Sequence, residues 1–130
     1  MGNSSHAEGY ETAAKGIGSH AEGGGSEAVG LRSHAEGSEV YANGSASHAE
    51  GALTQSLGYA SHAEGLRTVA RGYRSHTEGQ DTCILSTGGH AQGMANYHTN
   101  DLSVIHDVGI GTVVDNETET PESITRLSAE

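Results

Sequence analysis

Histidine and glutamate recur in this chain at a spacing that could support chemistry. Seven histidines follow one another at a constant interval, and each of the first six is followed two positions later by a glutamate. The two columns are His6, Glu8, His20, Glu22, His34, Glu36, His48, Glu50, His62, Glu64, His76, Glu78, His90 and Gln92. Imidazole and carboxylate groups can ligate a metal ion, transfer protons or hydrogen-bond across an interface.

The regularity of these columns favours a structural role. A metal centre needs a defined set of three or four ligands, and a catalytic site needs a pocket; an unbroken ladder offers neither. No nucleophile–base pair, phosphate-binding loop or group of convergent carboxylates can be placed, so we expect no catalytic, cofactor-binding or metal-binding residue and no enzyme activity. An ice-binding threonine face is also disfavoured, because the threonine column is predicted to face inward and is interrupted by Ser26 and Val40.

A 14-residue repeat carries the ladder. Ser-His-Ala-Glu-Gly occurs five times, at residues 5–9, 19–23, 33–37, 47–51 and 61–65, and decays at 75–79 and 89–93. A second glycine column follows the first at half the period, so each repeat is two copies of [Ser/Thr]-x-Ala-x-Gly-x-x. A fixed period of this kind indicates a repeat architecture.

Alternation within each half of the repeat predicts the elements. Period two is typical of a strand, so five extended residues and a two-residue turn form one leg, and two legs form one coil. About seven coils, stacked roughly 4.8 Å apart, predict a thin parallel β-roll over residues 5–98. Its expected core and turns are Ala7, Gly9, Ala14, Gly16, Ala21, Gly23, Ala28, Gly30, Ala35, Gly37, Ala42, Gly44, Ala49, Gly51, Gly58, Ala63, Gly65, Ala70, Gly72 and Gly79.

The outward faces of the two legs differ. His and Glu are uniform on the first leg, whereas the second leg drifts from Ala13 and Lys15 to Cys83 and Leu85. A uniform face implies that every coil meets the same surroundings, which rotational symmetry between identical chains supplies. We therefore expect the His/Glu columns to form the seam of a homo-oligomer, with His of one chain near Glu of the next. The direction in which pH acts on this seam is open.

Composition excludes several classes of protein. Leu, Ile, Val and Phe number only 19 of 130 residues, Trp is absent, and the net charge is −11. A large conventional core and a nucleic-acid surface are therefore excluded, and no stretch approaches the ~18 apolar residues of a membrane span. We expect no signal peptide. Cys83 allows no intrachain disulfide and is expected at an outward, exposed or half-buried position.

The last quarter of the chain is richer in aliphatic residues. Nine of the 19 Leu, Ile and Val residues lie in residues 99–130. We therefore treat residues 99–130 as a second region, separate from the roll domain of residues 1–98. Residues 102–114 predict one or two strands with a bulge or bend at Gly109 and Gly111, and residues 123–127 a last strand or arm. We expect a β cap that closes the roll and packs Val104, Val108, Ile110 and Val113 around the symmetry axis.

The repeat resembles the head domain of YadA-like trimeric autotransporter adhesins over residues 5–98. Its Ser-His-Ala-Glu-Gly form is similar to repeats in bacteriophage tail-fibre and appendage proteins and in related bacterial surface proteins. The resemblance implies an all-β, left-handed parallel β-roll that assembles as a parallel homotrimer. His and Glu replace residues that are usually apolar in the adhesins, and no coiled-coil stalk or membrane anchor is expected. These departures favour the phage proteins.

The expected function is accordingly structural. We expect a trimeric fibre or surface-decoration segment of a bacteriophage virion, with host attachment as a further role. The expected partners are the chain itself, other virion proteins and a host-surface receptor; no cofactor, nucleic acid or membrane insertion is expected. The alternative is the head of a bacterial trimeric adhesin on the cell surface, where it binds host cells or matrix.

Overall fold

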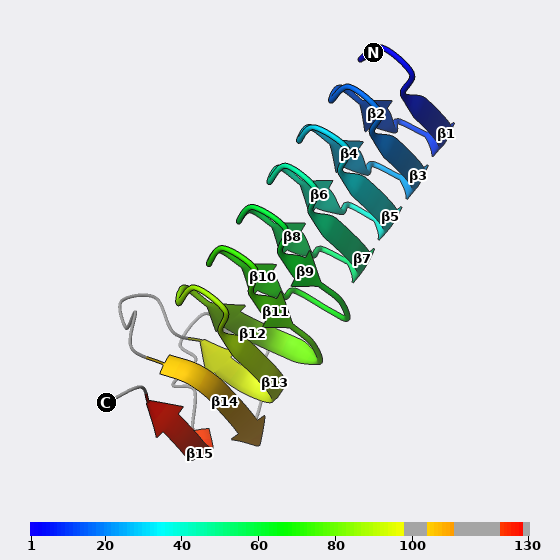
Figure 1. Ribbon diagram of the computed structural model, residues 1–130. Helices are drawn as coiled ribbons and strands as arrows, with labels where there is room; N and C mark the ends of the chain where they lie inside the picture. Colours follow the sequence, from blue (N-terminus) through cyan, green and yellow to red (C-terminus); the bar gives the residue numbers. More distant parts are fainter. Residues whose placement is uncertain (98–103, 111–122, 129–130) are drawn as a thin grey trace.

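The structure, a computed structural model, is an all-β parallel solenoid of about seven coils of about 14 residues (Figure 1). It describes residues 1–97, 104–110 and 123–128. The predicted repeat architecture is thereby confirmed at the level of the coil. The described part of the chain contains no helix long and apolar enough to cross a bilayer.

Two rows of strands run along the roll (Figure 1). The first leg of each coil contributes β1 (His6–Tyr10), β3 (His20–Gly24), β5 (His34–Ser38), β7 (His48–Ala52), β9 (His62–Ala63), β11 (His76–Thr77) and β13 (His90–Tyr97). The second leg contributes β2 (Ala13–Ala14), β4 (Glu27–Ala28), β6 (Tyr41–Ala42), β8 (Gln55–Ser56), β10 (Val69–Ala70) and β12 (Gln80–Ile84). Strand β13 pairs with both β11 and β12, so the two rows join into one sheet at that end.

The second-leg strands are shorter than predicted. The strands β2, β4, β6, β8 and β10 each span only two residues, because the chain turns directly after the buried small residue. The turn is visible in the hydrogen bonds: the Ala28 carbonyl accepts from the amides of both Lys15 and Gly16, at 2.7 and 3.3 Å. A shared acceptor ends the regular ladder, since two consecutive amides point at one oxygen.

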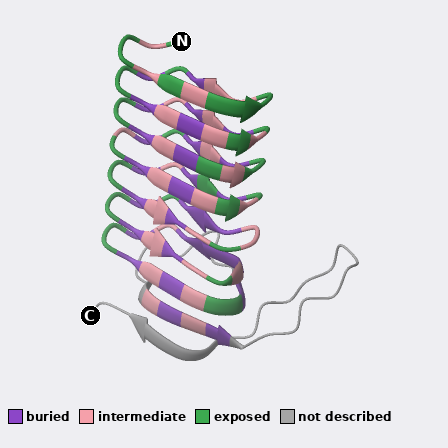
Figure 2. Cartoon of the chain, turned by 90° about the vertical axis from the view of Figure 1, so that its right-hand side faces the viewer, coloured by how far each residue is buried: buried purple, intermediate pink, exposed green. Residues whose placement is uncertain are grey.

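Small residues form the core of the roll, as the alternation predicts. Buried positions alternate with less buried ones along the first-leg strands (Figure 2). The fully buried alanines are Ala14, Ala21, Ala28, Ala35, Ala42, Ala49, Ala63, Ala70 and Ala91. Buried serine and threonine side chains lie beside them, and among the residues whose burial is described Ile84 is the largest fully buried side chain. Such a core removes little apolar area from water per residue. Because burial stabilises a fold by about 25 cal/mol per Å² of apolar area, the hydrophobic stabilisation per residue is small.

Glycine is required where successive coils touch. A Cβ atom on Gly44 would lie far inside van der Waals contact of the Gly58 carbonyl oxygen, and one on Gly37 would meet the Gly51 carbonyl. Gly37 also has a φ of 128°, which L-residues rarely adopt. Both glycine columns therefore follow from the close stacking of backbone on backbone.

Hydroxyl groups close the turns on both sides of the roll. The Ser19 side chain donates to the Gly16 carbonyl at 2.7 Å, and the serines at 5, 33, 61 and 75 make the equivalent bond, whereas the buried Ser47 hydroxyl makes none. On the opposite side, Thr54 donates to the Glu50 carbonyl at 3.0 Å. At Gly16 the serine hydroxyl is a second donor, since the carbonyl also accepts from the Ser19 amide at 3.2 Å.

Past the seventh coil, β14 (Val104–Ile110) stacks parallel on β13, and β15 (Ser123–Ser128) pairs antiparallel with β14. The expected strands in this region are thus present. The pairing of β14 with β15 shifts register between Val108 and Gly109, where the sequence predicts a bulge or bend. Val104, Val108 and Ile110 lie on β14, and Val108 is half-buried; Val113 is outside the described residues.

One expectation about burial is wrong. Cys83 is fully buried on β12, whereas its column was expected to face outward. Along this column of the second leg, Gln55 is exposed, Val69 is buried and Cys83 is fully buried, where β12 pairs with the long strand β13. Burial raises the pKa of the Cys83 thiol to about 11.

Candidate functional site

The His/Glu ladder occupies one face of the roll, on the first-leg strands. In-register pairing places His34 beside His48 and Glu36 beside Glu50, and the same holds for each neighbouring coil from β1 to β7. Because side chains alternate across a strand, the alanine between each His and Glu points into the core. The ladder is therefore a direct product of the repeat: one period gives one His and one carboxylate.

The imidazoles form a continuous stack. Between His20 and His90, neighbouring ring centroids are 4.7–4.9 Å apart and the rings lie within 11° of parallel. At the first coil the geometry changes, and His6 meets His20 edge-on at 5.1 Å and 80°. The coil spacing thus sets the stacking distance, and six rings share one orientation.

His106 extends the stack, which the sequence analysis missed. It pairs in register with His90, and their rings meet edge-on at 5.1 Å and 84°. The 14-residue period fails here, because it would place the next histidine at position 104, which is a valine. A smaller signal was present: His106 and Gly109 repeat the His-x-x-Gly spacing of the pentapeptide.

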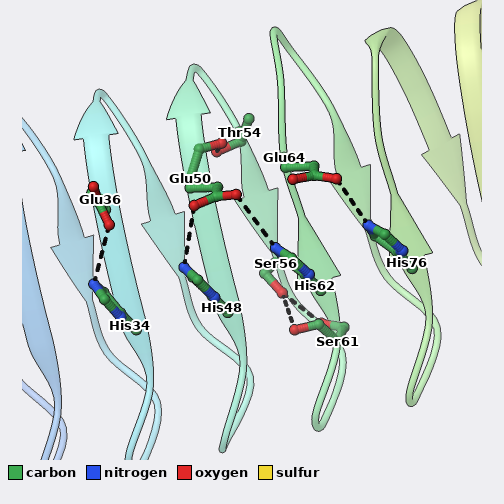
Figure 3. A network of polar contacts seen from close by, with 10 residues as sticks. All are labelled: His34, Glu36, His48, Glu50, Thr54, Ser56, Ser61, His62, Glu64 and His76. Atoms are coloured by element: carbon green, nitrogen blue, oxygen red, sulfur yellow. Dashed lines mark hydrogen bonds and ion pairs between the residues drawn. The ribbon is translucent and has the colours of Figure 1, made fainter.

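The carboxylates change partner along the ladder (Figure 3). Glu36 lies 3.7 Å from the Nε2 atom of His34 in its own coil, whereas Glu64 lies 3.4 Å from Nε2 of His76 in the next coil. The change occurs at Glu50, which faces both His48 at 3.7 Å and His62 at 3.9 Å. A glutamate of the ladder therefore contacts the histidine of its own coil, that of the next coil or, at Glu50, both.

The Nε2 atoms are buried without a hydrogen bond. Among the described residues this holds for His20, His34, His48, His62, His76 and His90. Their distances to carboxylate oxygens are 3.3–3.9 Å. A charge-assisted hydrogen bond is shorter, at about 2.7–2.9 Å. A buried polar atom without a partner costs free energy, so the ladder of a single chain is incomplete.

The ladder favours neutral imidazole. Burial lowers the pKa of His34, His48, His62 and His90 below the ordinary 6.5, and repulsion from neighbouring imidazoles adds to the effect. Burial also raises the pKa of Glu64 above 4.5, helped by interaction with the Glu50 carboxylate. At neutral pH the contacts that these four imidazoles make with glutamate are therefore not ion pairs.

Carboxylates and glycines line a groove beside the imidazole stack. Its volume is about 490 Å³, and its walls are Glu36, Gly37, Glu50, Gly51, Glu64, Gly65, Glu78 and Gly79. Within the ladder, three groups of imidazole and carboxylate side chains offer ligand atoms that lie within 4.8 Å of one another. This is the part of the described chain that could hold a cation.

The second leg has no comparable column among the described residues. Its polar contacts are individual pairs: Lys15 contacts Glu27, and at the neighbouring turns Arg67 binds Asp81 through two bonds of 2.5 and 2.7 Å. These pairs stabilise particular coils. Within the described roll, it is the first-leg face that presents the same two groups at successive levels.

Comparison with models of known protein families gave no match, and a search of curated proteins gave none either.

Proposed function

We propose that the chain is a structural virion protein, a fibre or surface-decoration segment of a bacteriophage built as a left-handed parallel β-roll homotrimer. The observation that carries the proposal is the column of six buried Nε2 atoms without hydrogen-bond partners on one uniform face. The resemblance of the Ser-His-Ala-Glu-Gly repeat to phage appendage repeats supplies the class of particle.

A symmetric seam would complete the ladder. In a parallel trimer, coil n of one chain meets coil n of its neighbours, so each unpartnered imidazole meets the same group at every level. Hydrogen bonds to a neighbouring chain remove the cost of burying these atoms alone. The drift of the second leg, from Glu27 to Tyr41 to Gln55, fits a face that no partner covers in this repeated way.

Association also supplies burial that the single roll lacks. The alanine, serine and threonine core is thin, and neighbouring repeats stabilise one another only along the roll. Three chains side by side add a second interface along the whole length. Strands β14 and β15 then act as the cap, covering the edge of the last coil.

Light scattering after size exclusion tests the assembly. The proposal predicts a particle of three times the chain mass of 13.3 kDa, and a 13.3 kDa species would overturn it. The double variant His48→Asp, His62→Asp places charge in the seam and should dissociate the assembly. The matched variant Gln55→Asp adds charge on the exposed second leg and should leave the mass unchanged.

Mass spectrometry of purified particles tests the location. Phage particles produced from DNA that encodes this chain should contain it at a fixed ratio to the other virion proteins. Recovery of the chain only from the outer surface of bacteria would overturn the virion assignment and favour the adhesin.

A further inference from the structure

We propose that the His/Glu ladder binds divalent transition-metal ions of the zinc, nickel and copper class, at three sites made by side chains of one chain. The sites are His34, Glu36 and His48; Glu50, His62 and Glu64; and Glu64, His76 and Glu78. This inference goes beyond the proposed function, because the three ligands of each site come from one chain and an ion takes the place of a neighbouring chain's group as the partner of Nε2.

The distances within the ladder fit a shared cation better than a hydrogen bond. Zinc holds imidazole nitrogen and carboxylate oxygen at about 2.0–2.2 Å, so two ligands of one tetrahedral ion lie about 3.3–3.5 Å apart. The Nε2–oxygen distances are 3.7 Å for His34 and Glu36 and 3.4 Å for His76 and Glu64. The ligand atoms of each site lie within 4.8 Å of one another, so its side chains must draw together by up to roughly 1.5 Å to hold one ion.

The lack of any hydrogen-bond partner at the buried Nε2 atoms, which also supports the proposed function, is a second observation. The four imidazoles of the three sites each present an Nε2 atom that is buried and makes no hydrogen bond. Each of these atoms lies on the side of the ring that faces the carboxylates (Figure 3). An ion placed between the columns would satisfy the nitrogen lone pairs together with the glutamates.

The donor set selects the class of metal. Imidazole combined with carboxylate suits zinc, copper and nickel, whereas magnesium and calcium prefer oxygen ligands alone. The first site offers two imidazoles and one carboxylate, a set that zinc proteins use with a fourth position left open. The other two sites share Glu64, so one carboxylate bridges two ions held on successive coils.

Metal content per chain tests the inference. The protein is stripped with chelator, dialysed against micromolar Zn²⁺ and analysed by elemental mass spectrometry. We expect three ions per chain for the wild type, two for His34→Gln and one for Glu64→Gln, with affinity at the altered sites at least tenfold weaker. His6→Gln is the matched control, since His6 belongs to none of the three sites, and it should retain three ions.

Cobalt provides a readout of coordination. Co²⁺ bound by imidazole and carboxylate in a four-coordinate site should give visible absorption that saturates with the metal content and falls in His34→Gln. Circular dichroism checks that each variant remains folded. Equal metal content in the wild type and all three variants, or no saturable binding, would mean an adventitious ion only and would overturn the inference.

The outcome can be separated from that of the proposed function. Light scattering in chelator and in Zn²⁺ reports the assembly, while elemental analysis reports the ions. A 13.3 kDa species that binds three ions would overturn the trimer and leave the sites standing. A trimer that binds no metal saturably would overturn the metal sites and leave the trimer standing.

Discussion

Each position of the Ser-His-Ala-Glu-Gly pentapeptide has its own physical task. In residues 19–23 the serine closes the preceding turn, the alanine fills the core, and the glycine lets the next coil approach. The His20 and Glu22 side chains lie on the outer face. The repetition of all five letters therefore records two constraints, close coil stacking inside and a uniform surface outside.

Gly44→Ala should destabilise the roll strongly. Its Cβ would collide with the carbonyl oxygen of Gly58, and backbone cannot move aside as a side chain can. We expect a loss of about 1–3 kcal/mol or more in the free energy of unfolding, measured by denaturant titration at fixed protein concentration. Gly24→Ala is the control: a Cβ there meets nothing within 4 Å. We expect that variant to gain about 0.4–1 kcal/mol. Equal effects of the two changes would contradict this account.

Cys83 should be inert in the native protein. The side chain is fully buried and its thiol pKa is about 11, so in mildly alkaline buffer the reactive thiolate is both scarce and covered. A chromogenic thiol reagent should react rapidly only after unfolding in denaturant. Gln55→Cys, on the exposed part of the same column, should add one thiol that reacts at once. Rapid reaction of native wild type would show that Cys83 is accessible.

The turns between the strands contain many residues in a strained backbone conformation. Positive φ values at the turns recur with the 14-residue period in two columns, and most of these positions are not glycine; examples are Arg32 at 55°, Leu53 at 58° and Ala60 at 52°. A left-handed conformation costs an L-residue roughly 1–2 kcal/mol. The stacked strands on either side hold these residues in place.

Ala60→Gly should therefore stabilise the protein. Relief of the left-handed strain outweighs the roughly 0.5–1 kcal/mol of added chain entropy, which gives a net gain of up to about 1 kcal/mol. Ala52→Gly, in strand β7 without a positive φ, should instead lower stability by about 0.5–1 kcal/mol. Thermal unfolding of the two variants beside wild type checks the opposite signs.

The elements also show how far sequence reasoning reaches. The 14-residue period and the alternation predict the coil, its parallel stacking and the inward alanines, because these depend on backbone geometry common to all strands. The burial of Cys83 and the place of His106 depend on how β12, β13 and β14 pair past the last regular repeat. At Arg32 and Ala60 the turn residue with a positive φ is not glycine, so its residue type does not indicate the left-handed conformation. The buried Nε2 atoms follow from packing, which a pattern of letters does not contain.

Acid should weaken the whole molecule through its histidine stack. The pKa of His34, His48, His62 and His90 is lowered in the folded chain, so between that lowered value and 6.5 the unfolded chain binds more protons. Stability is then full above pH 6.5 and declines as pH falls below it. The raised pKa of Glu64 has the opposite effect, because it increases stability as the pH falls toward 4.5. Four histidines outweigh this single glutamate.

Melting temperatures at pH 8 and pH 5, both in chelator, check this prediction. We expect the lower value at pH 5. A variant with His34, His48, His62 and His90 all changed to Gln should show a smaller difference between the two pH values. A higher melting temperature at pH 5 in the wild type would mean that protonated imidazoles gain partners in the assembly.

The register that pairs His34 with His48 has a consequence for inheritance. The first-leg register is the same between neighbouring coils from β1 to β7, so a gene segment encoding one repeat can be lost or duplicated without changing the register of the His and Glu columns. Removal of residues 34–47 would simply seat His48 on His20. The length of the rod therefore changes in steps of about 4.8 Å, the spacing of the stacked rings, and recombination between repeats can adjust reach while leaving the cross-section unaltered.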